Sequence, residues 1–210
     1  MELDSFNKRK STFAVISLFA AAILWYILFV IKPINFWVEM GISILILIAA
    51  AFIIGGIPKL QRITTRHIVI GVISAGVLYL IFFVGNIISG YLFPFKDAQI
   101  LSVYSNKSQG NLLWISLALL FIIGPGEEIY WRGFIQKTFS KAFGENKGYI
   151  LASLVYAGVH ITTGNFMLII AALVCGLFWG WIYKKEKSLI PVIISHALWD
   201  VTIFVLLPVK

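Results

Sequence analysis

The amino-acid sequence predicts an all-α protein, a polytopic bundle of about seven transmembrane helices that forms a single membrane domain over residues 1–210. Hydrophobic residues make up 60% of the chain and charged residues only 12%. Apolar runs long enough to cross a hydrocarbon core of about 30 Å recur throughout, which excludes a soluble globular fold. Each run is expected to be helical because lipid offers the backbone no hydrogen-bond partners. The expected spans are residues 12–31, 40–57, 68–92, 111–136, 148–161, 166–183 and 189–208.

The basic residues predict how these spans are oriented. The net charge of +8 does not indicate nucleic-acid binding, because the basic residues form short clusters between apolar runs instead of one basic domain. By the positive-inside rule, the span ends with more Lys and Arg are cytoplasmic. The N-terminus is therefore expected in the cytoplasm and the C-terminus outside, in a bacterial plasma membrane. The twelve residues of the richer set are Lys8, Arg9, Lys10, Lys59, Arg62, Arg66, Lys137, Lys141, Lys147, Lys184, Lys185 and Lys187, and the four of the other set are Lys32, Lys96, Lys107 and Lys210.

Two features near the span ends carry further predictions. The fifth span has only about 14 residues, or roughly 21 Å of helix, which is shorter than the hydrocarbon core. Its following turn, 162–165, is therefore expected to lie below the outer surface, where polar backbone lines water or protein. Aromatic residues near span ends are typical of the belt at a membrane surface. These residues are Trp25, Trp37, Trp114 and Tyr183.

The fourth span contains the segment GPGEEIYWRG at residues 124–133, which puts two carboxylates and an arginine into an apolar helix. An ionised residue at the centre of a span costs about 2.5–3.5 kcal/mol, so such groups persist where they are paired, face a cavity or serve function. Glu128 and Arg132 are spaced i, i+4, which predicts an ion pair on one helix face. Glu127 points about 100° away and is left to act on a water or a metal. Pro125 removes a backbone hydrogen bond just before the carboxylates.

The fifth and seventh spans add two histidines and a carboxylate to this chemistry. His160 lies in the fifth span, and His196 and Asp200 share one face of the seventh at i, i+4. Counted from the cytoplasmic ends, Glu127, His160, His196 and Asp200 lie at depths of about 15, 18, 11 and 17 Å. Three helices thus offer acid, base and donor groups at a similar level of the membrane.

These residues form three motifs that resemble a known family. They are Glu-Glu-x-x-x-Arg at 127–132, an aromatic residue and histidine at Tyr156 and His160, and His-x-x-x-Asp at 196–200. Their order, spacing and helical context are similar to those of the CAAX-processing and bacteriocin-processing (CPBP, or Abi) intramembrane proteases, which are related to the CAAX prenyl endopeptidase. The similarity covers residues 111–208. Tyr156 stands where the family more often has Phe, and Asp200 where the eukaryotic enzyme has Asn.

The resemblance implies an intramembrane endopeptidase whose active site lies among the fourth, fifth and seventh spans. It further implies that Glu127 and His160 activate a water, that His196 and Asp200 stabilise the oxyanion or position the water, and that Glu128 and Arg132 support them. The expected substrate is a membrane-associated or lipidated peptide or peptide precursor. This scheme agrees with the residues themselves, since a general base and preorganised donors are what peptide hydrolysis needs.

Several alternatives stay open at this point. Glu127, His160 and His196 could instead hold a divalent metal such as zinc, although no cofactor is firmly implied and the metal-free mechanism is slightly favoured. The chain could be a catalytically silent family member that acts as a membrane regulator or bacteriocin-immunity protein. It could also be a proton-coupled transporter, but no internal repeat or matched pair of interrupted helices supports that hypothesis. The oligomeric state and the identity of the substrate stay open as well.

Overall fold

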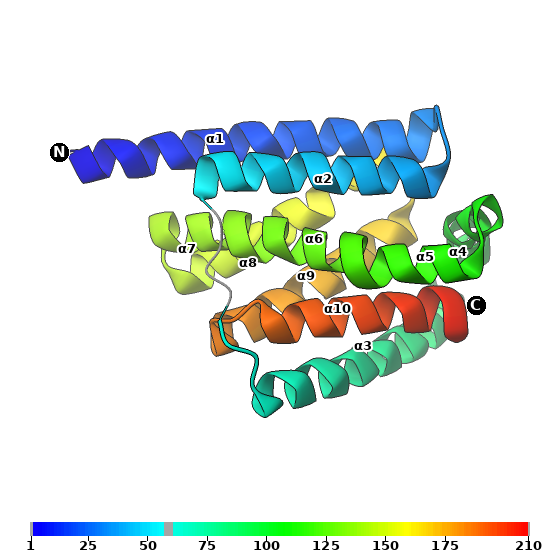
Figure 1. Cartoon of the computed structure of the whole chain (residues 1–210). Coiled ribbons are helices and arrows are strands. Elements are labelled where there is room, and N and C mark those ends of the chain that lie inside the picture. The colour runs from blue at the N-terminus through cyan, green and yellow to red at the C-terminus, as the bar shows by residue number, and fades with distance from the viewer. Residues whose placement is uncertain (1, 57–60, 210) are drawn as a thin grey trace.

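A computed structural model describes residues 2–56 and 61–209, with side chains from residue 12 onward. The described residues contain helices and turns and no strand, which confirms the predicted all-α class (Figure 1). The first half of the chain forms α1 (Glu2–Tyr26), η1 (Ile27–Ile31), α2 (Phe36–Gly55), α3 (Thr65–Leu92), α4 (Lys96–Tyr104) and η2 (Ser105–Gln109). The second half forms α5 (Leu112–Ala118), η3 (Leu119–Ile123), α6 (Gly124–Glu128), η4 (Ile129–Gln136), α7 (Lys137–Phe143), α8 (Glu145–Gly158), η5 (Ile161–Thr163), α9 (Phe166–Glu186), α10 (Ile190–Val201) and η6 (Thr202–Leu206).

Local chemistry explains where several of these helices begin. Asparagine or threonine precedes α2, α3, α5 and α9, and in each case its side-chain oxygen accepts a hydrogen bond from a backbone N–H of the first turn. The turn between α7 and α8 needs Gly144, whose φ of 84° suits a residue without Cβ. The capping residues are Asn35, Thr64, Asn111 and Asn165.

Five of the described helical runs are long and apolar enough to cross a membrane. The longest joins α5 to α7 in one run of 32 residues, and it contains the glutamate motif. The helix expected for the fifth span is α8, which has 14 residues, and the last run, Ile190–Leu206, is also shorter than a full span. The chain is therefore a polytopic membrane protein, while the count of seven crossings stays a prediction. The five long runs are Thr12–Ile31, Phe36–Gly55, Thr65–Leu92, Leu112–Phe143 and Phe166–Glu186.

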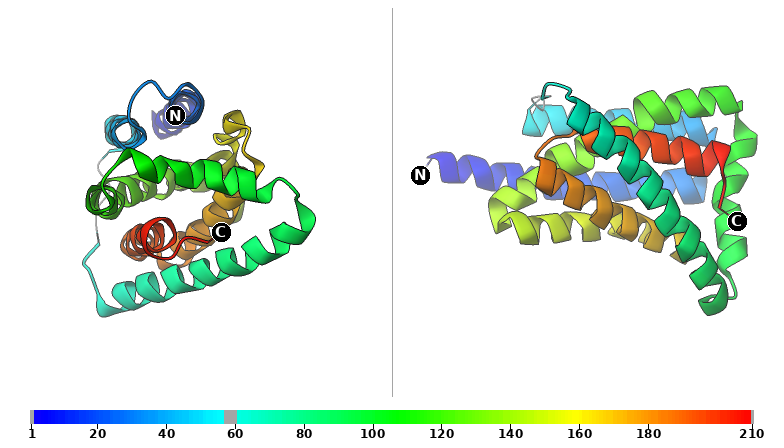
Figure 2. Two further views of the ribbon diagram at one scale, coloured as in Figure 1. Left: turned by 90° about the vertical axis from the view of Figure 1, so that its right-hand side faces the viewer. Right: turned by 90° about the horizontal axis from the view of Figure 1, so that it is seen from below.

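The helices lie roughly side by side, with the two ends of the chain at opposite ends of the bundle (Figure 1). The pair α1 and α2 covers one side, and α3 and α10 pack together on the other (Figures 1 and 2). The long run from α5 to α7 passes between α2 and α10 and contacts both. The glutamate motif is therefore at the centre of the bundle, away from lipid.

Basic residues near helix ends pair across the bundle at the end where the chain starts. Arg66 Nη2 lies 2.8 Å from Glu186 Oε1, which ties the start of α3 to the end of α9. Lys187 pairs with Glu145 at the start of α8, and the hydrogen bond from Lys187 lowers the pKa of the Glu145 carboxyl below its usual value. These contacts bring the basic clusters of Arg66 and Lys187 to one end of the bundle, whereas the orientation of that end in the membrane stays a prediction. Lys59 and Lys210 lie outside the described residues, as do the side chains of Lys8, Arg9 and Lys10.

Candidate active site

The glutamate pair lies in α6, a short helix held by two close contacts. A Cβ atom on Gly126 would lie 2.2 Å from Cγ2 of Ile44 in α2, and one on Gly124 would lie 3.0 Å from the Cα of Ala197 in α10. A side chain at either position would force α6 away from its neighbour. The π-helical segments η3 and η4 flank α6, and such segments are frequent at functional sites. Gly124 thus lets the glutamate helix lie close to α10, and Gly126 lets it lie close to α2.

Glu128 forms the centre of a buried charged network. Its side chain is fully buried, and its Oε1 accepts a hydrogen bond from Arg132 Nη1 at 2.8 Å. This is the ion pair that the i, i+4 spacing predicts. The same oxygen lies 2.7 Å from Nδ1 of His196, so the proton of that bond is assigned to Nδ1. Glu128 therefore orients His196 as well as pairing with Arg132, a contact that sequence spacing does not predict.

Arg132 is also held by neutral groups, which lowers the cost of burying its charge. Its Nη2 lies 3.3 Å from the carbonyl oxygen of Cys175 and 3.4 Å from that of Gly176 in α9. Its guanidinium carbon lies 4.9 Å from the ring centre of Tyr156, within the range of a cation–π contact. α9 can supply these carbonyls because Gly176 lets it approach α8, where an added Cβ would lie 3.1 Å from the Ser153 carbonyl oxygen.

The imidazole of His196 has further neighbours on its flat face, where Trp179 stacks, and at Nε2, which lies near Asp200. The ring of Trp179 stacks on the imidazole, with centres 3.8 Å apart and planes 20° apart. Trp179 is itself anchored, since its indole N–H donates to Ser195 Oγ at 3.1 Å. On the open edge, His196 Nε2 lies 3.5 Å from Asp200 Oδ2. Trp179 was not a candidate from the sequence, because one tryptophan in an apolar span carries no polar signal.

Glu127 points to a different neighbour, as its helical position predicts. The hydroxyl of Tyr156 in α8 donates to Glu127 Oε2 at 2.7 Å. The hydrogen bond that the described residues make to this carboxylate goes to Oε2 and leaves Oε1 to other partners. Glu127 is only 5% exposed, yet it borders a cavity between the helices. Its second oxygen is thus the acceptor available to a molecule in that cavity.

His160 has both ring nitrogens engaged. Its Nε2 accepts a hydrogen bond from the indole N–H of Trp25 at 2.9 Å, and its Nδ1 lies 2.9 Å from the carbonyl oxygen of Tyr156. A carbonyl can only accept, so Nδ1 carries the proton and the imidazole is the neutral Nδ1–H tautomer. The predicted place of Trp25 in an aromatic belt is wrong: it is 1% exposed and faces His160 instead of the membrane surface. No sequence pattern marks that contact, because 135 positions separate the two residues.

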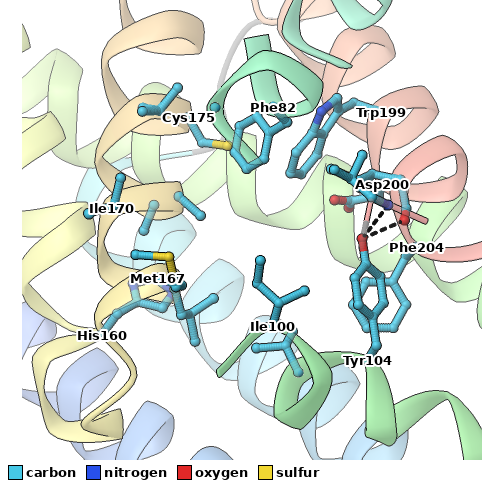
Figure 3. A pocket seen from close by; sticks show the side chains of 18 of the residues that line it. Phe82, Ile100, Tyr104, His160, Met167, Ile170, Cys175, Trp199, Asp200 and Phe204 are labelled. Carbon is cyan, nitrogen blue, oxygen red and sulfur yellow. Dashed lines mark hydrogen bonds between the residues drawn. The ribbon is translucent and has the colours of Figure 1, made fainter. Parts of the chain in front are cut away.

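All four candidate residues line one cavity of about 470 Å³. In Figure 3, His160 and Asp200 lie on opposite sides of this pocket, with apolar side chains such as Phe82, Met167 and Ile170 on the wall between them. Tyr156 links Glu127 to His160, and Glu128 links Arg132 to His196. The site thus consists of two hydrogen-bonded groups that face a shared space with largely apolar walls.

A metal site does not form from the candidate ligands in this arrangement. Among the described residues, no three His, Cys, Asp or Glu side chains are grouped so that they could hold one metal ion. His160 Nε2, the nitrogen that a metal would need, accepts from Trp25 instead.

Part of the chain is similar to a known protein family. Residues 109–202 match a family model described as Type II CAAX prenyl endopeptidase Rce1-like. The matched segment runs from the end of η2 to the start of η6, so it contains all four candidate residues together with Glu128 and Arg132. Neither the curated proteins nor the solved structures provide a significant match. Trp25 lies outside the matched segment.

Proposed function

We propose that this chain is an intramembrane endopeptidase of the Rce1-like CAAX protease family, because residues 109–202 match the model of that family. It would hydrolyse peptide bonds of membrane-associated or lipidated peptides or peptide precursors. Its site would be the cavity that Glu127, His160, His196 and Asp200 line. We expect it to act as an integral protein of a bacterial plasma membrane.

The observation that carries this proposal is the buried carboxylate of Glu127 at the wall of the cavity. A general base has to lie within hydrogen-bond reach of the proton that it removes. Tyr156 holds Oε2, which leaves Oε1 as the acceptor toward the cavity. A water in the cavity could therefore give a proton to Glu127 as its oxygen attacks the carbonyl carbon of a peptide bond. When the tetrahedral intermediate collapses, the C–N bond breaks and the same proton passes to the leaving amine.

His196 and Asp200 are placed to act on the oxyanion that forms during this attack. An oxyanion needs a hydrogen-bond donor, and an ionised carboxylate is an acceptor only. The donor in this group is therefore a proton on His196 Nε2 or on the carboxyl of Asp200. Glu128 and Trp179 would serve as positioning residues, since the first binds Nδ1 of His196 and the second stacks on its ring.

The cavity walls suit a substrate that is delivered from the membrane. Most of the lining is apolar, with many of its side chains from α3, α4 and α9 (Figure 3). The polar side chains include the four candidate residues and also Asn86, Ser89 and Gln99. An apolar wall favours apolar segments of a peptide, or a lipid attached to it, over a charged soluble peptide. The substrate class in this proposal rests on that contrast and on the family.

Cleavage by the purified protein tests the proposal. Membrane peptides and lipidated peptides are incubated with wild type and with Glu127→Gln, and the products are sequenced. Glu127→Gln keeps the shape of the side chain but removes the base, so cleavage should fall about 100-fold or more. The matched control is Glu39→Gln, since Glu39 is a buried glutamate in α2 that does not line the cavity. Equal cleavage by wild type and Glu127→Gln would remove the proposed role of Glu127.

A further inference from the structure

The N-terminal helix contributes a residue to the candidate site. Trp25 lies in the last turns of α1, lines the same cavity and donates its indole N–H to His160 Nε2. The two rings meet edge to face, with centres 5.9 Å apart. The family match begins at residue 109, so this contact joins the family segment to a helix that the match does not cover.

The bond to Trp25 determines what His160 can do. A neutral imidazole has one donor and one acceptor nitrogen. In His160 the donor is taken by the Tyr156 carbonyl and the acceptor by Trp25. The lone pair on Nε2 is the group that would take a proton from a water. In this arrangement Oε1 of Glu127 can accept a hydrogen bond from a molecule in the cavity. Nε2 of His160 cannot, because it already accepts one from Trp25.

The surroundings of His160 identify which partner can move. The ring of His160 is packed edge to face against Tyr156 and tilted against Phe29, with centres 5.6 and 6.3 Å apart. Nδ1 is bonded to the Tyr156 carbonyl in α8, the helix that ends just before His160. Rotating the imidazole would break these contacts together. Trp25 is also buried and borders the same cavity, but turning its indole breaks one hydrogen bond and the edge-to-face contact, both of them with His160.

We propose that Trp25 is a positioning residue that caps the Nε2 lone pair of His160, and that the cap must open before His160 can accept a proton. The proposal rests on the function proposed above for the step in which His160 assists Glu127. The site then has two states. With the bond from Trp25 in place, only Glu127 can accept a proton from a water in the cavity, and with the bond broken, both Glu127 and His160 can.

The test measures how readily the Nε2 lone pair of His160 reacts with an acylating reagent. Diethyl pyrocarbonate acylates the unprotonated nitrogen of an imidazole, and peptide mass mapping gives the extent of reaction at His160 and His196 in the same molecule. In Trp25→Phe the ratio of His160 to His196 modification should rise about threefold to tenfold, because one hydrogen bond to the reacting nitrogen is lost. The matched control is Trp37→Phe, since Trp37 lines the same cavity but donates to the Asn106 carbonyl. Its ratio should equal that of wild type.

Each result separates this proposal from the peptidase assignment. Should Trp25→Phe fold poorly, Trp25→Leu removes the same donor with a different volume and should give the same rise. A rise in both variants without cleavage of any peptide by wild type supports the cap and overturns the peptidase. Cleavage by wild type with an unchanged ratio in the Trp25 variants overturns the cap and leaves the peptidase in place. If both proposals hold, kcat for cleavage rises in Trp25→Phe by a factor similar to the change in the ratio.

Discussion

The two histidines of the site are held in opposite ways. His196 is bonded to the carboxylate of Glu128, which Arg132 also binds, and lies near a second carboxylate on Asp200. His160 is bonded only to neutral groups, the Trp25 indole and the Tyr156 carbonyl. Buried hydrogen bonds between charged groups are strong and costly to break, whereas a hydrogen bond between two neutral groups is weaker and is broken more easily. We therefore expect His196 to keep its hydrogen bonds during the reaction, and His160 to exchange its bond with Trp25.

Removing the cation from the His196 side should have the largest effect. Arg132→Leu leaves Glu128 buried beside His196 without its permanent positive partner, which should lower the free energy of unfolding by about 3–5 kcal/mol. Unfolding in mixed micelles measures this loss. The control is Arg66→Leu, which breaks the ion pair with Glu186 at a largely exposed arginine and should change stability far less. Equal losses in the two variants would contradict a rigid charged network around His196.

A smaller effect is expected on the His160 side, where Tyr156 joins the two proposed water-activating residues. Tyr156→Phe removes the hydroxyl bond to Glu127 and keeps the backbone bond to His160. We expect kcat to fall about tenfold with little change in KM, because the loss is one charge-assisted hydrogen bond to the base. Steady-state cleavage kinetics measure both constants. Tyr130→Phe is the control, since Tyr130 is also buried but its hydroxyl bonds Ser17. A change in KM alone would assign the Tyr156 hydroxyl to substrate binding.

The smallest effect is expected at Asp200, and it tests how the His196 side works. Asp200→Asn keeps the shape and adds an amide donor, so cleavage should stay within about threefold of wild type if this residue donates to the oxyanion. The measurement combines cleavage rates with the metal content of both purified proteins and their response to a strong chelator. A stoichiometric metal that disappears together with activity in Asp200→Asn would favour the metal mechanism instead.

The parts of the site that the sequence predicts are local along one helix. The Glu128–Arg132 ion pair follows from i, i+4 spacing, and the different directions of Glu127 and Glu128 follow from the helical rotation of about 100° per residue. The all-α class follows in the same way from apolar runs that only helices can carry through lipid. Each of these predictions needs information from one segment only.

The contacts that sequence reasoning missed join different helices. The bond from His196 to Glu128 spans 68 positions, and the bond from Trp25 to His160 spans 135. Both depend on how helices pack, for example on the close approach that Gly124 and Gly126 allow. Trp25 resembled a belt residue because position near a span end predicts an aromatic belt and cannot tell which helix face meets a partner. The depth of a residue can be counted from the sequence, but its partner across the bundle cannot.

The unequal lengths of two neighbouring helices have a consequence for the surrounding lipid. α8 has 14 residues, about 21 Å of helix, and packs against α7 and η4 in a run of 32 residues. Part of α8 faces outward, with Ile150 and Leu154 exposed. The sequence predicts that α8 crosses the membrane, and a span this short would favour local thinning of the bilayer beside it, at a cost of a fraction of a kcal/mol per ångström. Since α8 also carries Tyr156, we expect the rate of cleavage to vary with the acyl-chain length of the lipids in which the protein is reconstituted.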